Sequence, residues 1–260
     1  MNRQQGIVIG VAIVLFVALF YGFDIIPPKQ KALEKSRAVT VEATSLENLL
    51  KEARPKLNKN QTSVIDAIQM DLDKSGVDTI KKIEVLKALS GTWYEYGYPA
   101  LSGIYAENIA NLVQSDSAWS IAGTTYEICF VKLKDDRTRE FCSKRAIRAF
   151  ENAISLNPDN IEARINLAVC YVDNPDKDNP MQGILMLREL NQKYPENVPV
   201  LNQLGRLAIQ TNQIDKAIER LEAAIIINPE NQNTICLLAE AYEAASEPEK
   251  AKFYRDKCVH

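Results

Sequence analysis

The side chains that most often carry enzyme chemistry are scarce in this sequence. Its one histidine, His260, is the last residue, so the usual general base and a common metal ligand are missing from the rest of the chain. The sequence contains no P-loop, no G-x-S-x-G or H-E-x-x-H motif and no dinucleotide-binding glycine fingerprint. Asp71 and Asp73 form a pair on a helix surface, without the spacing of an acid/base site. We therefore expect no catalytic, cofactor or metal site, and no enzyme.

The cysteines are the second group of chemically active side chains. They are odd in number, widely spaced and include no C-x-x-C pair: Cys129, Cys142, Cys170, Cys236 and Cys258. This spacing favours small buried residues of helices, with a disulfide or redox role as the alternative. The lack of a cysteine framework favours a reducing compartment.

The composition indicates which elements position these residues. Aromatic residues make up 7% of the chain, and glycine and proline are few, which suits helices better than a sandwich or barrel rich in turns. The formal net charge is -3, so nothing suggests nucleic acid as a partner.

The N-terminal region contains a long uncharged segment. Residues 6–23 read GIVIGVAIVLFVALFYGF, and two isoleucines prolong the run past Asp24 to residue 26 before Pro27 and Pro28 stop it. A helix of this length spans about 27 Å, close to the hydrocarbon thickness of a bilayer. Residues 1–26 are therefore predicted to be a transmembrane anchor, with a cleaved signal peptide as the alternative.

The charges around this segment leave its orientation open. Arg3 precedes the segment, and four basic residues follow it: Lys29, Lys31, Lys35 and Arg37. This bias favours a single-pass membrane protein whose C-terminal domain is cytoplasmic. A short positive N-terminus ahead of a signal anchor would instead export that domain.

Helical patterns begin after a polar stretch. Residues 27–61 are rich in Lys, Glu, Asn and Thr and are predicted to be a linker, with one short helix over 45–54. Residues 62–115 carry apolar stripes at helical spacing. Gly76 is expected to end the first helix in the left-handed conformation, and Pro99 to begin a later one. No stretch alternates like a strand, so the prediction is all-α.

An internal repeat defines the remainder of the chain. Residues 146–171 overlie residues 217–242 after a shift of 71 positions, with 11 of 26 positions identical. That shift equals two periods of 34 plus 3 extra residues, which fall in the polar stretch 173–180. A middle copy fills the slots of Ala146, Phe150, Ala153 and Pro158 with these residues: Gly183, Leu187, Leu190 and Pro195.

These residues resemble the tetratricopeptide repeat family, whose 34-residue unit is a hairpin of helices A and B with the pattern W-x2-L-G-x2-Y, A-x3-F-x2-A, P. The best copy covers residues 198–231 and contains Leu201, Leu204, Gly205, Ala208, Ala217, Leu221, Ala224 and Pro229. The copy before the middle one has Trp119, Ala122, Gly123 and Tyr126, but its two halves are about eleven residues too far apart. Small residues such as Gly205 and Ala217 should lie where two helices approach closely.

The resemblance implies a right-handed superhelix of antiparallel hairpins, with repeats over 116–160, 161–197, 198–231 and 232–260. Residues 84–115 are candidates for a degenerate copy. The A helices should line a concave groove that captures a protein or peptide. By the family's pattern, the groove includes these residues: Thr124, Glu127, Asn202, Arg206, Glu240 and Glu243.

The long connection inside the 116–160 copy is a second candidate site. Its basic residues are Lys132, Lys134, Arg137, Arg139, Lys144 and Arg145, beside three acidic ones. Such a run is either a solvated extension or a docking surface for an acidic partner or lipid head groups.

The expected function is that of a membrane-anchored scaffold or adaptor that binds a partner protein in its groove. The alternative is a structural envelope protein that self-associates and has no dedicated ligand.

Overall fold

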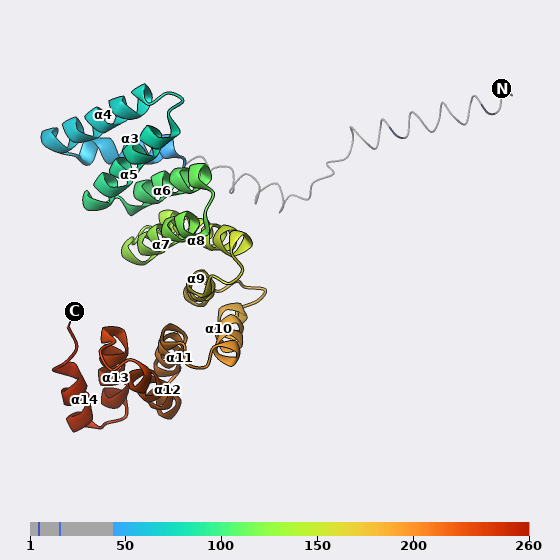
Figure 1. The fold of residues 1–260 in the computed structure, drawn as a ribbon, viewed down its shortest axis with the longest axis vertical. Coiled ribbons are helices and arrows are strands. Elements are labelled where there is room, and N and C mark those ends of the chain that lie inside the picture. The colour runs from blue at the N-terminus through green and yellow to red at the C-terminus, as the bar shows by residue number, and fades with distance from the viewer. Residues whose placement is uncertain (1–4, 6–15, 17–43, 260) are drawn as a thin grey trace. The chain divides into compact units, whose positions relative to one another are not determined.

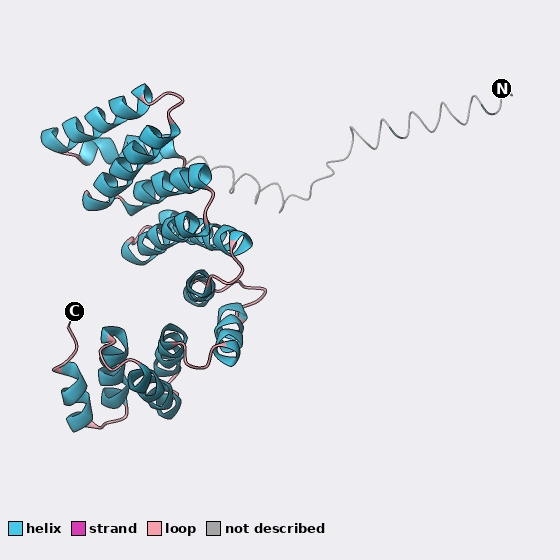
Figure 2. Ribbon diagram, in the orientation of Figure 1, coloured by secondary structure: helices cyan, strands magenta, loops and turns pink. Residues whose placement is uncertain are grey.

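A computed structural model describes residues 5, 16 and 44–259 of this chain. Within these residues it contains twelve α-helices, one 3-10 helix and no strand (Figure 2). In chain order they are α3 (Leu46–Ala53), η1 (Arg54–Lys56), α4 (Lys59–Lys74), α5 (Thr79–Glu95), α6 (Pro99–Val113), α7 (Asp116–Lys132), α8 (Asp136–Leu156), α9 (Ile161–Asp173), α10 (Gln182–Lys193), α11 (Val198–Gln210), α12 (Ile214–Ile227), α13 (Gln232–Ala244) and α14 (Pro248–Arg255). The all-α prediction is confirmed for the described residues.

The chain divides into two units, Met1–Glu52 and Ala53–His260, and the account below concerns the second. The predicted anchor, residues 6–26, lies outside the described residues. Among the helices that the structure does describe, none combines the length and the apolar character needed to cross a bilayer.

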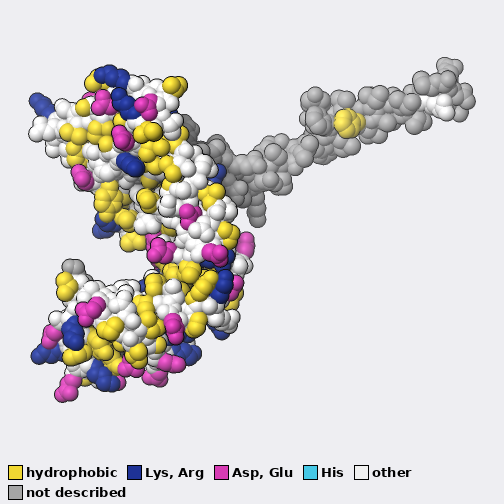
Figure 3. Space-filling view, in the orientation of Figure 1, with side chains coloured by type: hydrophobic (Ala, Val, Ile, Leu, Met, Phe, Trp, Pro, Cys, Tyr) yellow, Lys and Arg dark blue, Asp and Glu magenta, His cyan; other side chains and the backbone are white. Residues whose placement is uncertain are grey.

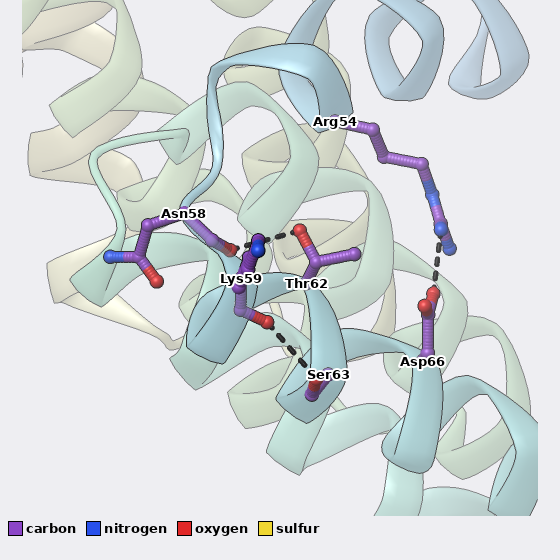
Figure 4. Close-up of polar contacts among 6 residues, drawn as sticks. All are labelled: Arg54, Asn58, Lys59, Thr62, Ser63 and Asp66. Atoms are coloured by element: carbon purple, nitrogen blue, oxygen red, sulfur yellow. Dashed lines mark hydrogen bonds and ion pairs between the residues drawn. The ribbon is translucent and has the colours of Figure 1, made fainter.

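Helix α4 begins at Lys59, three positions before residue 62, where the sequence predicts the helical region to begin. Asn58 explains this start, because its side chain accepts the Gln61 N–H at 2.9 Å while the Gln61 side chain accepts the Asn58 N–H. Figure 4 shows the same end of the helix, where Arg54 reaches Asp66 at 2.6 Å. At the other end, Gly76 has the predicted left-handed conformation, with φ +53°.

From α5 onward, each helix packs against the next and the hairpins follow one another along the chain (Figure 1). Pro99 is the first residue of α6, as predicted. Helices α8, α10 and α12 each end two residues before a proline, at Pro158, Pro195 and Pro229. The predicted insertion at 173–180 falls in the connection between α9 and α10.

The core is continuous across neighbouring hairpins. One cluster joins α9, α10 and α11 through residues such as Ile165, Leu187 and Leu204, all buried. A second cluster joins α11 to α14 around Leu221 and Leu238. No hairpin buries its apolar face alone, so the stack stabilises each member.

Glycines mark the closest helix contacts, as the repeat pattern predicts. A Cβ added at Gly205 would lie 2.7 Å from the Leu221 side chain, and one at Gly123 would lie 2.6 Å from the Phe150 ring. At Gly183 it would meet the backbone of α9, at the Ala168 carbonyl oxygen and, 2.7 Å away, the Val172 nitrogen. The hairpins therefore require small residues at these positions.

For four of the five cysteines the alternative, a disulfide role, holds, and two of these, Cys129 and Cys142, are also buried helix residues. Cys129 pairs with Cys142 and Cys236 pairs with Cys258, at Cα–Cα distances of 5.9 and 5.0 Å, while Cys170 is a free, buried thiol. Sequence spacing could not reveal these pairs, because each forms between segments that meet only after the helices pack: Cys129 of α7 meets Cys142 of α8, and Cys236 of α13 meets Cys258, which follows α14.

The long connection predicted inside the 116–160 copy is not a loop. Its extra residues lengthen α7 to Lys132 and start α8 at Asp136, which leaves only residues 133–135 between them. Asp135 caps α8 by accepting the Thr138 N–H at 2.8 Å. The Cys129–Cys142 disulfide joins the two helices in this extension.

Candidate protein-binding surface

The first helices of successive hairpins form the surface where the sequence places the groove. We call α5, α7, α9, α11 and α13 the A-helix row. Contacts connect α7 to α9, α9 to α11 and α11 to α13. Lys132 of α7 also reaches α5, where its ammonium donates to the Tyr94 hydroxyl at 3.2 Å and lies over the ring. The row is therefore continuous from α5 to α13.

Asn202 holds two helices of this row together. It is only 2% exposed, and its side-chain oxygen accepts the Thr234 hydroxyl of α13 at 2.8 Å. Its amide nitrogen donates to Asn231, which in turn caps α13 through the Thr234 N–H. Because these groups are used within the fold, Asn202 is not available to a ligand as the sequence reading had placed it.

We expect Asn202→Ala to lower the free energy of unfolding by about 1 kcal/mol, since it removes the buried hydrogen bond between Asn202 and Thr234 while the Thr234 hydroxyl keeps Asn231 as an acceptor. Chemical denaturation of the full chain measures this loss. Thr234→Val and the double variant complete a mutant cycle. Losses that simply add would show that the contact between Asn202 and Thr234 contributes nothing.

Arg206 and Glu127 belong to a charged cluster across three helices of the row. The Arg206 guanidinium lies 3.3 Å from the carboxylate of Asp173, the last residue of α9, and also donates to Gln203. Burial raises the pKa of Glu127, the negative charge of Asp173 raises it further, and Arg206 opposes both. Both predicted residues are half-buried and lie near each other on the row.

Cys170, on α9, lies close enough to Glu127 and Asp173 of this cluster for their charges to affect it. Its thiol is 6% exposed, and burial followed by the charges of Glu127 and Asp173 raises its pKa well above the ordinary value. A thiol held protonated in this way is a poor nucleophile. The favoured prediction of a small buried helix residue without a disulfide role is confirmed for Cys170.

The raised pKa of Glu127 makes stability depend on pH. The folded chain holds this proton more tightly than the unfolded chain, so protonation stabilises the fold below the ordinary pKa of 4.5, and that stabilisation is lost as the pH rises through the raised value. We expect Glu127→Gln to have a higher melting temperature than the wild type at neutral pH. The difference should disappear under acid conditions. Glu240→Gln on α13 is the control, and a uniform difference at all pH values would contradict this assignment.

The other predicted groove residues are exposed. Thr124 lies on α7 and Glu240 on α13, and neither side chain makes an ion pair within the described residues. Glu243, also on α13, pairs with Arg255 of α14 at 2.5 Å. Thr124 and Glu240 are therefore the members of the predicted set that are most accessible to a partner.

Most of the predicted basic residues have partners inside the fold. Arg145 pairs with Glu107 of α6 at 2.7 Å, and Lys144 pairs with Glu140 at 2.5 Å. Arg139 donates to the Phe130 carbonyl and lies over that ring. Lys134 and Arg137, at the end of the α7–α8 extension, make no ion pair with the described part of the chain. The six residues do not form one accessible basic patch.

The structure also contains an apolar cleft that the sequence reading missed. It measures about 410 Å³ and lies between α5 and α7, with α6 also contributing to its lining. We call it the α5–α7 cleft. Ile83 and Ile121 line it from the two A helices, and Ile109 and Val113 line it from α6. Ile121 is 64% exposed, but the repeat pattern assigns no role to its position, so no sequence signal pointed to this cleft.

Two further observations concern the chemistry of the surface. Within the described residues, no three His, Cys, Asp or Glu side chains gather as a metal site would require. On the face shown in Figure 3, acidic and basic side chains are interspersed rather than separated into areas of one sign.

Comparison with known proteins supports the repeat architecture. Residues 198–231, which contain α11 and α12, match the family model described as tetratricopeptide repeat. These 34 residues are similar to a tetratricopeptide repeat. A tetratricopeptide repeat protein from Parabacteroides merdae shares the fold, with a TM-score of 0.53, 13% identity, and 82% of this chain and 78% of that chain covered.

Two curated relatives match part of the chain. Anaphase-promoting complex subunit 3 of Dictyostelium discoideum is 24% identical over 103 residues, which is 40% of this chain and 10% of that protein. The CTR9 homologue of Arabidopsis thaliana is 26% identical over 113 residues, with 42% of this chain and 10% of that protein covered. The chain thus spans about a tenth of the length of these relatives.

Proposed function

We propose that this chain is a membrane-anchored scaffold that binds a partner protein along the A-helix row and so assembles or recruits a complex. The observation that carries this proposal is the continuity of the row from α5 to α13, secured by side-chain contacts such as those of Asn202 and Arg206. These contacts fix a surface that a partner can meet without reordering the helices. One relative is named as a subunit of the anaphase-promoting complex, in keeping with an assembly role.

The sequence of residues 6–23 supports the anchor. The segment carries no charged residue and is long enough as a helix to cross the hydrocarbon core of a bilayer. Tyr21 and Phe23 stand at one end, where interfacial aromatic residues are common.

The two disulfides support placing the repeats on the non-cytoplasmic side of the membrane. Such bonds persist in oxidising compartments and are rare where glutathione and thioredoxin keep thiols reduced. We therefore prefer export over the cytoplasmic side that the distribution of Lys and Arg favours. An alkaline phosphatase fusion at the C-terminus should be active, and maleimide labelling in intact cells should modify Cys258, which is partly exposed, only after reduction. An inactive fusion together with freely labelled cysteines would reverse this assignment.

Site-specific photo-crosslinking tests the binding surface. A photoreactive phenylalanine derivative is placed in the full chain at Thr124 or at Glu240, both exposed on the A-helix row. The matched control position is Glu219, exposed on α12 outside the row. We expect discrete crosslinked products from the row positions, identified by mass spectrometry, and none from the control.

The pattern of products separates the candidate functions. A different protein attached at row positions supports the scaffold. A second copy of this chain would instead support the self-associating envelope protein. Absence of products at both row positions would remove the proposed surface.

A further inference from the structure

The α5–α7 cleft exposes apolar surface that the fold leaves uncovered. Ile121 is 64% exposed and Val113 is 43% exposed, and both line the cleft with Ile83 and Ile109. Its volume of about 410 Å³ is in the range of sites that hold bound groups. Covering these side chains would contribute about 25 cal/mol for each Å² of apolar surface removed from water.

Lys87 is the one charged residue in the lining of this cleft. It projects from α5, is exposed, and makes no ion pair with any residue that the structure describes. The three serines of the lining already have partners: Ser90 donates to the Ser102 carbonyl at 2.9 Å, Ser115 caps α7, and the Ser117 hydroxyl lies 3.1 Å from that of Ser115. The polar group left for a ligand is therefore the Lys87 ammonium.

A second cation lies farther along the same pair of helices. Lys132 of α7 stands over Tyr94 of α5, which follows Lys87 by seven residues, or about 10 Å along the helix. Between them, a Cβ at Gly91 would meet no atom within 4 Å, so the surface there is open. Lys87 and Lys132 thus lie at the two ends of an unobstructed stretch of the α5 surface, which begins at the apolar cleft.

From these observations we propose that the α5–α7 cleft binds an acidic amphipathic helix of the partner. An aliphatic side chain of that helix enters between Ile83 and Ile121, and carboxylates spaced two turns apart meet Lys87 and Lys132. This proposal rests on the scaffold function and specifies the chemistry of the partner for one part of the A-helix row.

The spacing and the charges favour this occupant. Residues i and i+7 of an α-helix lie on one face about 10 Å apart, which matches the separation along α5 between Lys87 and Tyr94. A helix laid in an apolar groove binds through such a stripe, and its flanking charges set specificity and the rate of association. A basic segment of the same shape would be repelled by both lysines.

Two synthetic peptides of equal length test the proposal. Each carries leucines at helical spacing and a fluorescent label. One has glutamates at positions i and i+7 beside the stripe, and the other has lysines there. Fluorescence anisotropy with the full chain in detergent should show that the glutamate peptide binds roughly tenfold more tightly. Equal affinities, or binding of neither peptide, would overturn the proposal.

Variants of the chain locate the binding site. Lys87→Glu should remove most of the preference for the glutamate peptide, and Ile121→Ser should weaken its binding several-fold. The matched controls are Lys74→Glu on α4 and Ile226→Ser on α12, both exposed and outside the cleft. Circular dichroism melts of all four variants establish that they fold. Equal effects from the controls and from the cleft variants would overturn the site.

The photo-crosslinking experiment separates this proposal from the scaffold function. Repeating it at Thr124 in Lys87→Glu should reduce the yield of the crosslinked partner. If the wild type crosslinks a partner at Thr124 but the peptides do not discriminate, the scaffold stands and the acidic helix is wrong. If no row position crosslinks, the scaffold itself is wrong. Binding to anionic vesicles in place of the glutamate peptide would also contradict a protein ligand.

Discussion

Reduction of the two disulfides is expected to lower the free energy of unfolding by about 3 kcal/mol for each bond. The bonds close loops with sequence separations of 13 and 22 residues, so each restricts the unfolded chain by a similar amount. Urea denaturation of the same purified chain, with and without a phosphine reductant, measures the loss without changing the sequence.

A cysteine variant provides the control for this experiment. Cys170→Ala removes the free thiol and should leave the effect of the reductant unchanged. Cys236→Ala should remove the contribution of the bond to Cys258 and leave that of Cys129–Cys142. Unfolding that does not respond to reductant, in a sample whose cysteines all react with maleimide from the start, would contradict the pairing.

The second large effect on stability is expected when one methyl group is added at Gly183. Gly183→Ala should destabilise the chain by about 1–3 kcal/mol, because the new Cβ would press on the backbone of α9 at Ala168 and Val172. Backbone cannot rotate away as a side chain can, so α9 and α10 must separate. Thermal unfolding followed by circular dichroism measures the change.

Gly91→Ala is the matched control for this substitution. Gly91 is also helical, but a Cβ there meets no atom within 4 Å. The exchange should therefore stabilise the chain by about 0.5–1 kcal/mol through helix propensity alone. Equal effects at the two positions would show that close helix packing does not determine the cost at Gly183.

The repeat pattern predicted those parts of the fold that depend on local chemistry and period. Gly205 and Gly123 lie at close helix contacts, and Pro158 follows the end of α8, because residue size and a missing N–H act wherever the hairpin recurs. The pairing of the cysteines could not be predicted, because it depends on which side chains meet after the helices pack.

The predicted groove residues also show that sequence does not reveal the contacts that form after packing. Pattern position alone placed Asn202 beside Thr124 as a ligand contact, yet one is buried between α11 and α13 and the other is exposed. The difference arises from Thr234 on the neighbouring helix, whose hydroxyl donates a hydrogen bond to the side-chain oxygen of Asn202. Side chains at equivalent positions of a repeat point in the same direction relative to their helices. Whether a partner protein can reach them depends on the side chains of the neighbouring helix.

Because of where the disulfides lie, different regions of the helical stack resist local unfolding to different degrees. One bond closes the α7–α8 pair and the other ties Cys236 of α13 to Cys258, while α9 to α12 have none. Within this interval, α9 and α10 are joined by residues 174–181, and each contains a buried polar atom without a partner in the described structure, on Arg164 and Asn191. Local unfolding in a stack proceeds where a unit is held least firmly. A protease would therefore cut this connection first, and the chain would come apart from its middle rather than from its C-terminal end.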